Sequence, residues 1–231
     1  MKNSIISVGM ELEGSFVGDK TRSQRERWLM NLAESCDIHN FDIGDDGSVA
    51  VYGSSDCRDI INGELRGWVE IENINSLFEF VKECFNDSFT QNDSCGNHIH
   101  VRFKDDYAAL HVLSTPRSWE MFKMEYEAYS QFKSKKYKNR LTNHYCYLNE
   151  NSFNSNWIET NRYSGLNILS YFEQQRTLEI RILPYVVTGE EYEENVKWLL
   201  ETITKIVNSE FNITYEKEFK KESYGKLAQR I

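Results

Sequence analysis

The sequence predicts an α+β fold, with helices covering one face of a largely antiparallel sheet. Two patterns support this class: short stretches in which apolar and polar residues alternate, and longer stretches in which apolar residues recur at helical spacing. Strand candidates come in pairs between the helices, an order that favours antiparallel neighbours. The chain has 231 residues, two prolines and no visible linker. We therefore expect one domain over 1–231.

The first half of the chain alternates strands with amphipathic helices. "IISVGMELEG" at 5–14 alternates and predicts a strand, and residues 22–36 carry apolar side chains at helical spacing. "FDIGDDGSVAVYG" at 41–53 predicts two short strands around an Asp-Gly turn. "GELRGWVEI" at 63–71 predicts a strand with a glycine interruption, and 75–85 predicts a helix with one apolar stripe.

The second half continues with the same kinds of element. "GNHIHVRF" at 96–103 predicts a strand, and residues 115–132 predict a helix. "RYSGLNILSYF" at 162–172 is mixed and is closer to a strand pattern. "RTLEIRILPY" at 176–185 alternates cleanly and predicts a strand, and the last helix is expected over 190–208.

Composition narrows the function classes. With a net charge of −9 the chain is not expected to bind nucleic acid, although the basic segment "KSKKYKNR" at 133–140 suits phosphate on a small ligand. No apolar run reaches the ~18 residues of a membrane span, and the N-terminus lacks the pattern of a signal peptide. The five cysteines include no CxxC pair, which favours reduced thiols in the cytoplasm over disulfides or a zinc site.

Charged residues occupy one face of four strand candidates. Side chains two positions apart on a strand point to the same side of a sheet. His98 and His100 of "GNHIHV" therefore share a face, and Ile99 and Val101 share the other. The same spacing pairs further charged residues on three other strands, namely Glu11 with Glu13, Glu64 with Arg66, and Glu179 with Arg181.

Convergence of these faces would bring four carboxylates and two imidazoles together. Such crowding costs several kcal/mol unless cations neutralise the carboxylates. Carboxylates suit Mg²⁺ and Mn²⁺, and both ions accept an imidazole ligand. The pattern indicates a multi-metal site that handles phosphate, with Arg181 binding the transferred group. Each pair alone is more typical of a solvated surface, so the inference rests on their combination.

The motifs also resemble a known family. "VGMELEG", "DDGSV", "GELRG", "NDSCGNHIHV", "NRLTNHYCYL", "RYSGLN" and "RTLEIRILPY" occur in the order found in the amidoligases of the glutamine synthetase-like carboxylate–amine ligase superfamily. The resemblance covers 5–187 and leaves 188–231 as a C-terminal helix and tail. Asn97 stands where that family usually has a small apolar residue. The segment after Glu64 lacks the family's proline-rich continuation, which borders the substrate pocket.

The resemblance implies a fold and a reaction. The fold would be a curved, mainly antiparallel sheet with helices packed on one face and an open, charged active-site face. The reaction would be ATP-dependent ligation, in which a carboxylate becomes an acyl phosphate and an amine then displaces phosphate to form an amide. ATP and Mg²⁺ (or Mn²⁺) would be the cofactors. The partners would be small-molecule or peptide carboxylates and amines, and neither nucleic acid nor a membrane.

The same resemblance implies a role for each candidate residue. The metal that bridges the β- and γ-phosphates would be bound by Glu11, His98 and Glu179, and the metal nearer the amine by Glu13 and Glu64. The other roles would be phosphate contact (His100 and Arg181), binding of the carboxylate substrate or further phosphate oxygens (Arg162 and Arg140), and orientation or deprotonation of the amine (Asp46).

Other function classes stay open beside the ligase. A hydrolase built on the two histidines and the carboxylates would prefer zinc and would not turn over ATP. A phosphotransferase of related fold, such as a guanidino kinase, would stop after phosphoryl transfer. A non-catalytic interaction protein of the same fold is the third class, although an intact set of charged residues argues against it.

Overall fold

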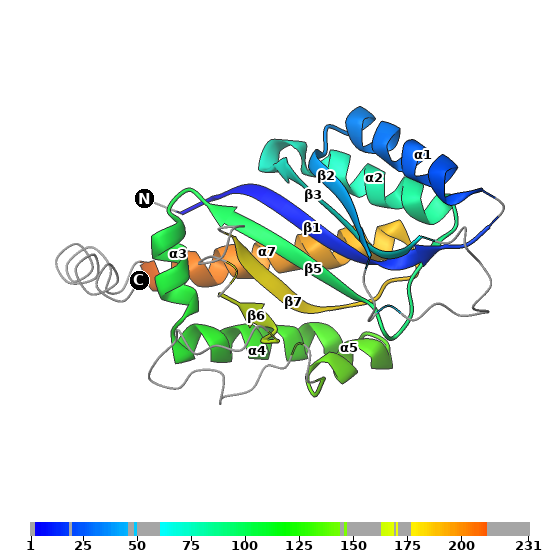
Figure 1. Cartoon of the computed structure of the whole chain (residues 1–231). Coiled ribbons are helices and arrows are strands. Elements are labelled where there is room, and N and C mark those ends of the chain that lie inside the picture. The colour runs from blue at the N-terminus through cyan, green and yellow to red at the C-terminus, as the bar shows by residue number, and fades with distance from the viewer. Residues whose placement is uncertain are drawn as a thin grey trace.

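Figure 1 shows a computed structural model that describes residues 3–18, 20–45, 49, 61–143, 146, 163–168, 170 and 177–211. Its centre is an antiparallel sheet with the strand order β2-β3-β1-β5-β7-β6, and β4 pairs with one end of β1. The strands are β1 (Ile5–Phe16), β2 (His39–Asp45), β3 (Asn62–Glu70), β4 (Phe89–Thr90), β5 (Gly96–Phe103), β6 (Leu166–Asn167) and β7 (Leu178–Pro184).

The helices lie behind the sheet and along its β7 side. They are α1 (Arg22–Ser35), the short 3-10 helix η1 (Ile71–Asn73), α2 (Ile74–Asn86), α3 (Asp106–Leu113), α4 (Pro116–Gln131), α5 (Lys135–Arg140) and α7 (Gly189–Phe211). In Figure 1, α7 crosses behind the strands and packs against α2, whereas α5 contacts β7. Thr115 caps α4 by accepting a hydrogen bond from the backbone N–H of Ser118 at 3.2 Å.

One face of the sheet forms the hydrophobic core with these helices. Met10 and Leu12 of β1 and Ile99 of β5 are at most 2% exposed, and they belong to the same buried cluster as Val196 and Leu199 of α7. Because residues alternate between the two faces of a strand, burial of this set turns the intervening residues to the opposite face. The α+β class and the mainly antiparallel sheet are therefore confirmed.

Elements with a regular sequence pattern lie where the sequence predicts them, including the long helix α7 and the strands β1, β5 and β7. The elements α3, α5 and β4 have no counterpart in the prediction, because eight residues or fewer show too little periodicity. Within 41–53 the structure describes the end of β2, and the expected second strand falls outside the described residues apart from Val49. Within 162–172, Leu166–Asn167 form β6. No described helix is long and apolar enough to cross a membrane.

β7 contains a bulge at the centre of the charged face. Two of its residues, Arg181 and Ile182, oppose the single residue His98 of β5, where the register between the strands shifts. On either side of this point, Ile180 and Leu183 are both fully buried at 0% exposure. Regular alternation would turn one of these two side chains onto the charged face. Because of the bulge, Leu183 can point into the core while Arg181 points to the charged face.

Candidate functional site

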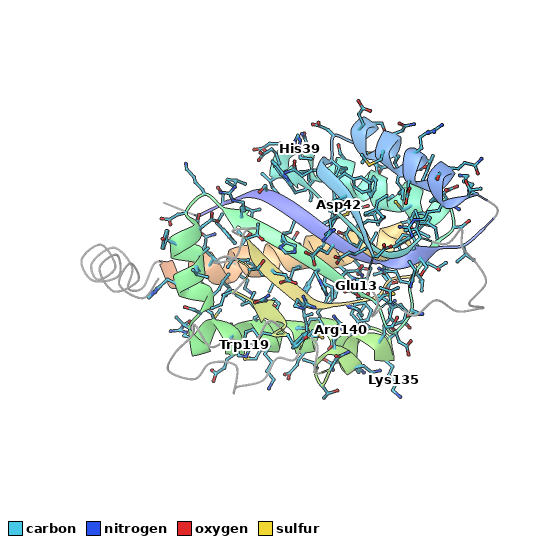
Figure 2. The ribbon with its side chains drawn as sticks, in the orientation of Figure 1. Glu13, His39, Asp42, Trp119, Lys135 and Arg140 are labelled. Carbon is cyan, nitrogen blue, oxygen red and sulfur yellow. The ribbon has the colours of Figure 1, made fainter. Side chains whose placement is uncertain are left out.

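The register of the sheet brings the charged residues of three strands together. Glu11 of β1 lies opposite His98 of β5, and His100 lies opposite Glu179 of β7. Directly opposed residues have Cβ atoms about 4.5–5.5 Å apart, so their side chains meet. Figure 2 shows Glu13 on the same stretch of β1. These side chains are buried, since Glu13, both histidines and Glu179 are between 4% and 7% exposed.

Glu11 lies between the two histidines. Its Oε2 is 3.0 Å from Nδ1 of His98, and its Oε1 is 3.1 Å from Nε2 of His100. Burial raises the pKa of Glu11, but hydrogen bonds and charges of His100 and His98 outweigh burial and hold this pKa well below its usual range. Burial lowers the pKa of His100, but contact with Glu11 and the charge of Glu179 outweigh burial and raise it. The carboxylate of Glu11 is therefore ionised in this cluster.

Glu179 completes the cluster from β7. Its Oε1 lies 2.5 Å from Nη1 of Arg181 and 3.5 Å from Nδ1 of His98. Its Oε2 accepts a hydrogen bond from Nδ2 of Asn167 at 2.6 Å. Arg181 shares the charged face with Glu179, in agreement with the predicted strand alternation, and its side chain is 14% exposed.

Glu11, His100 and Glu179 have the geometry of a metal site, and we call them the metal triad. One ligand atom from each lies within 4.8 Å of the others. Two ligands of one Mg²⁺, at about 2.1 Å each, lie at most about 4.2 Å apart, so a small closure would fit an ion. Nε2 of His100 is buried, and its carboxylate neighbour is Oε1 of Glu11 at 3.1 Å. The donor atoms therefore fit a hard divalent cation.

His98 borders the same carboxylates as the metal triad. Its Nδ1 contacts Glu11 and Glu179, and its Nε2 lies 3.5 Å from Oε1 of Glu13. His98 therefore contacts two carboxylates of the metal triad without belonging to it. The expected division, with His98 on the metal and His100 on phosphate, stays a prediction.

Glu13 and Glu64 are direct neighbours across β1 and β3. Oε2 of Glu13 accepts a hydrogen bond from the backbone N–H of Gly96 at 2.5 Å, and Oε1 of Glu64 lies 3.3 Å from Nη1 of Arg66. In the part of the chain that the structure describes, neither carboxylate belongs to a group of three ligands close enough to share an ion. A second metal at this end of the face stays a prediction.

Arg140 reaches the site from the end of α5, and Figure 2 shows it beside β7. It is 8% exposed, and its Nη2 and Nε donate to the backbone carbonyls of Arg181 and Ile182 at 2.5 and 3.3 Å. Two of its three nitrogens are thus engaged with the strand. Its expected contact with a substrate carboxylate or phosphate stays a prediction. Asp46 and Arg162 lie outside the described residues.

Two lysines of the basic segment at 133–140 form ion pairs with α7. Nζ of Lys133 lies 2.5 Å from Oε1 of Glu194, and Nζ of Lys136 lies 2.7 Å from Oε1 of Glu191. These two acidic residues near the start of α7 form ion pairs with the two lysines. The expected contact of this segment with phosphate stays a prediction.

A cavity of about 740 Å³ lies beside the metal triad and shares Glu11 and His100 with it. Trp68 of β3 forms part of its wall, and the Trp68 ring packs on His39 with ring centroids 4.5 Å apart. Gly9 also lines the cavity, and a Cβ at this position would lie 3.2 Å from Cβ of His100 and 3.5 Å from Cβ of Trp68. The cavity therefore joins the candidate metal position to an aromatic surface.

Gly9, Trp68 and Arg102 also line this cavity, although they are not among the site residues predicted from the sequence. The signal was present in the strand period. The alternation that turns Glu64 and Arg66 to the charged face continues to Trp68, and the alternation through Glu11 extends back to Gly9. Following each charged face to the end of its strand would have identified these positions.

The chain was compared with models of known protein families, with curated proteins and with solved structures, and none of these three comparisons gives a match.

Proposed function

We propose that the protein is an ATP-dependent carboxylate–amine ligase that forms an amide through an acyl phosphate. The observation that carries this proposal is the buried group of the metal triad, His98 and Arg181 on one face of the sheet. Buried carboxylates at this spacing favour a divalent cation, and a cation beside an arginine suits a phosphoryl group. The motifs shared with the amidoligases favour ligation among the reactions that transfer phosphate.

Mg²⁺ or Mn²⁺ would be bound by Glu11, His100 and Glu179. When bound, the ion supplies neutralising charge for the carboxylates and for the transferring phosphoryl group. The grouping of an imidazole nitrogen of His100 with carboxylate oxygens of Glu11 and Glu179 supports its choice as a ligand. His98 then orients Glu11 through its 3.0 Å contact, as the outer partners of metal ligands commonly do.

The cavity beside the metal triad supports ATP as the phosphoryl donor. Its volume of about 740 Å³ lies within the usual range for small-molecule sites. The adenine ring would stack on Trp68. Arg102 at the cavity is half-exposed and lies 3.6 Å from Asp106, so its loosely held charge is suited to a phosphate oxygen.

The ligation would proceed in two steps on this face. An oxygen of the carboxylate substrate attacks the γ-phosphorus, and ADP leaves with the electrons of the broken bond. The amine then attacks the acyl carbon, phosphate leaves, and the amine nitrogen loses a proton. Arg181 would stabilise the phosphoryl charge in both steps. Asp46 and Arg162 would keep the roles that the resemblance implies, on the amine and the carboxylate.

Hydroxylamine trapping tests the proposal. The protein is incubated with ATP, Mg²⁺, hydroxylamine and a panel of amino acids, dicarboxylates and short peptides. An acyl phosphate reacts with hydroxylamine to give a hydroxamate, so hydroxamate and ADP should appear in equal amounts. The Glu179→Gln variant is the control and should form neither. ADP without hydroxamate across the panel would contradict ligation and favour another phosphotransferase.

A metal-dependent hydrolase is the second candidate, because two imidazoles beside carboxylates also suit zinc. Zinc-dependent cleavage of ester or amide substrates, with no use of ATP, would favour this class. For either reaction we propose a reducing compartment such as the cytoplasm. This compartment fits the four described cysteines, which are all free thiols, namely Cys36, Cys84, Cys95 and Cys146.

A further inference from the structure

The bulge in β7 needs hydrogen-bond donors that β5 does not supply. At a bulge the extra residue drops out of the ladder, and a buried carbonyl must then find another donor. Arg140 supplies donors to both bulge residues, since its Nη2 and Nε bond the carbonyls of Arg181 and Ile182. The hydroxyl of Tyr126 also donates to the carbonyl of Ile182, at 3.3 Å. The bulge is thus held by side chains from α4 and α5.

Arg140 is itself held firmly in this position. It is the last residue of α5, and the hydroxyl of Tyr137 in the same helix lies within hydrogen-bond distance of Oε1 of Glu191 at 2.7 Å and of Oδ1 of Asn195 at 2.9 Å. The backbone carbonyl of Tyr137 accepts a hydrogen bond from Tyr126 at 3.0 Å. The short helix is therefore tied to both α7 and α4 while Arg140 extends to β7.

The charge of Arg140 has no carboxylate partner among the described residues, where its side-chain hydrogen bonds go to the two bulge carbonyls. Burial of a guanidinium without an opposite charge is unfavourable unless its donors are used. Among the described residues, no ion pair accounts for the burial of this arginine. Its bonds to the bulge are the interactions that the structure offers in its place.

We propose that Arg140 is a positioning residue that fixes the β7 bulge and thereby holds Glu179 and Arg181 toward the metal triad. Loss of the bulge would move the strand by one residue and turn neighbouring side chains to the other face. In this role Arg140 acts through the backbone carbonyls of β7 and not through a contact with the metal. The inference rests on the metal site of the proposed function.

Mn²⁺ binding without nucleotide distinguishes a positioning role of Arg140 from a purely electrostatic effect of its charge. A buried cation near the metal triad repels a metal ion, so loss of that charge alone would tighten Mn²⁺ binding. Loss of a positioning residue does the opposite, because the ligands are no longer held together. The two explanations thus predict changes of opposite sign.

The experiment titrates Mn²⁺ by electron paramagnetic resonance in wild type, Arg140→Gln and Arg140→Lys. Hydrogen exchange of the backbone amides in 178–184 is measured on the same proteins. Both variants should bind Mn²⁺ about tenfold more weakly or worse, as for other groups that orient metal ligands. Lysine keeps the charge but cannot bond both carbonyls in the geometry of Nε and Nη2, so it should not rescue binding. Exchange in 178–184 should be faster in both variants.

Arg25→Gln is the matched control. Arg25 is another buried arginine, at 3% exposure, and it bonds Asp87 and packs on the ring of Phe16. This variant should lose stability without a change in Mn²⁺ affinity. It should also leave exchange in 178–184 unchanged, because its partners do not include β7.

Unchanged or tighter Mn²⁺ binding in Arg140→Gln, with unchanged exchange in 178–184, would overturn the proposal. If the wild type binds no Mn²⁺, the metal site of the proposed function fails, and exchange in 178–184 alone decides the role of Arg140. If Arg140→Gln does not fold, Tyr126→Phe removes the hydroxyl that bonds the carbonyls of Tyr137 and Ile182, without a change of charge. It should weaken Mn²⁺ binding about threefold and speed exchange in 178–184, and no effect on either would contradict the role.

Discussion

Oε1 of Glu11 and Nε2 of His100 lie 3.1 Å apart, although the register of β1 and β5 places Gly9 opposite His100. The contact is diagonal, and the missing side chain at Gly9 leaves space beside the imidazole. The residue directly opposite Glu11 is His98, which contacts the other carboxylate oxygen. The two histidines therefore approach one carboxylate from different positions, and their substitution should have different effects.

His100→Ala should remove Mn²⁺ binding, because it deletes a ligand atom of the metal triad. His98→Ala should weaken binding by about 10- to 100-fold, because Glu11 loses the partner that orients it. Titration of each variant with Mn²⁺ without nucleotide measures both effects. The reverse order would restore the assignment that the family resemblance implies, with His98 as ligand and His100 on phosphate. Equal affinities in both variants and wild type would remove the histidines from the site.

Glu179→Gln should fold and lose Mn²⁺ binding, whereas the neighbouring Ile180→Ala should be destabilised. Glutamine keeps the shape of the buried side chain but not its charge. Ile180 is 0% exposed in the core, and truncation of such a residue costs about 2–5 kcal/mol. Thermal unfolding and Mn²⁺ titration of the two variants check this contrast. If Ile180→Ala is tolerated and Glu179→Gln unfolds, the assignment of the two faces of β7 is wrong.

The charged face could be predicted because it depends on a local rule. Alternation within one strand fixes which side chains share a side, so Glu11, His98 and Glu179 could each be assigned from a few neighbouring residues. The apolar residues between them point to the other face, so it was clear which residues of each strand form the charged face. Their convergence needed only an antiparallel sheet in which these strands are neighbours.

The bulge and its support could not be predicted in this way. A bulge is a property of two paired strands, and nothing in "TLEIRILPY" alone marks Arg181 and Ile182 as opposing one residue. Arg140 lies in a basic segment whose charge indicated phosphate binding, and only tertiary packing shows its nitrogens on backbone carbonyls. The cavity likewise depends on which strands lie next to each other.

Trp68→Ala should raise the Michaelis constant for ATP while leaving Mn²⁺ binding without nucleotide unchanged. Adenine would lose its stacking on the indole ring, and stacking of a base on an aromatic ring is worth about 1–3 kcal/mol. Trp28→Ala is the control, because Trp28 packs on Phe16 and Lys20 and does not line the cavity. Nucleotide titrations followed by calorimetry measure the effect. Equal nucleotide affinity in Trp68→Ala and wild type would place the base elsewhere.

The raised pKa of His100 should give the metal-free fold and the metal complex opposite pH dependences. Without metal, the folded protein binds this proton more tightly than the unfolded chain does. The resulting stabilisation is fully present below about pH 6.5 and is lost as pH rises through the raised pKa. Mn²⁺ instead needs a neutral Nε2, so the increase in Tm caused by Mn²⁺ should grow over the same interval. Thermal unfolding with and without Mn²⁺, between about pH 6 and 9, measures both slopes. His100→Ala should flatten the metal-free slope and abolish the Mn²⁺ increment. A pH-independent increment in the wild type would show that protons and metal do not compete at this imidazole.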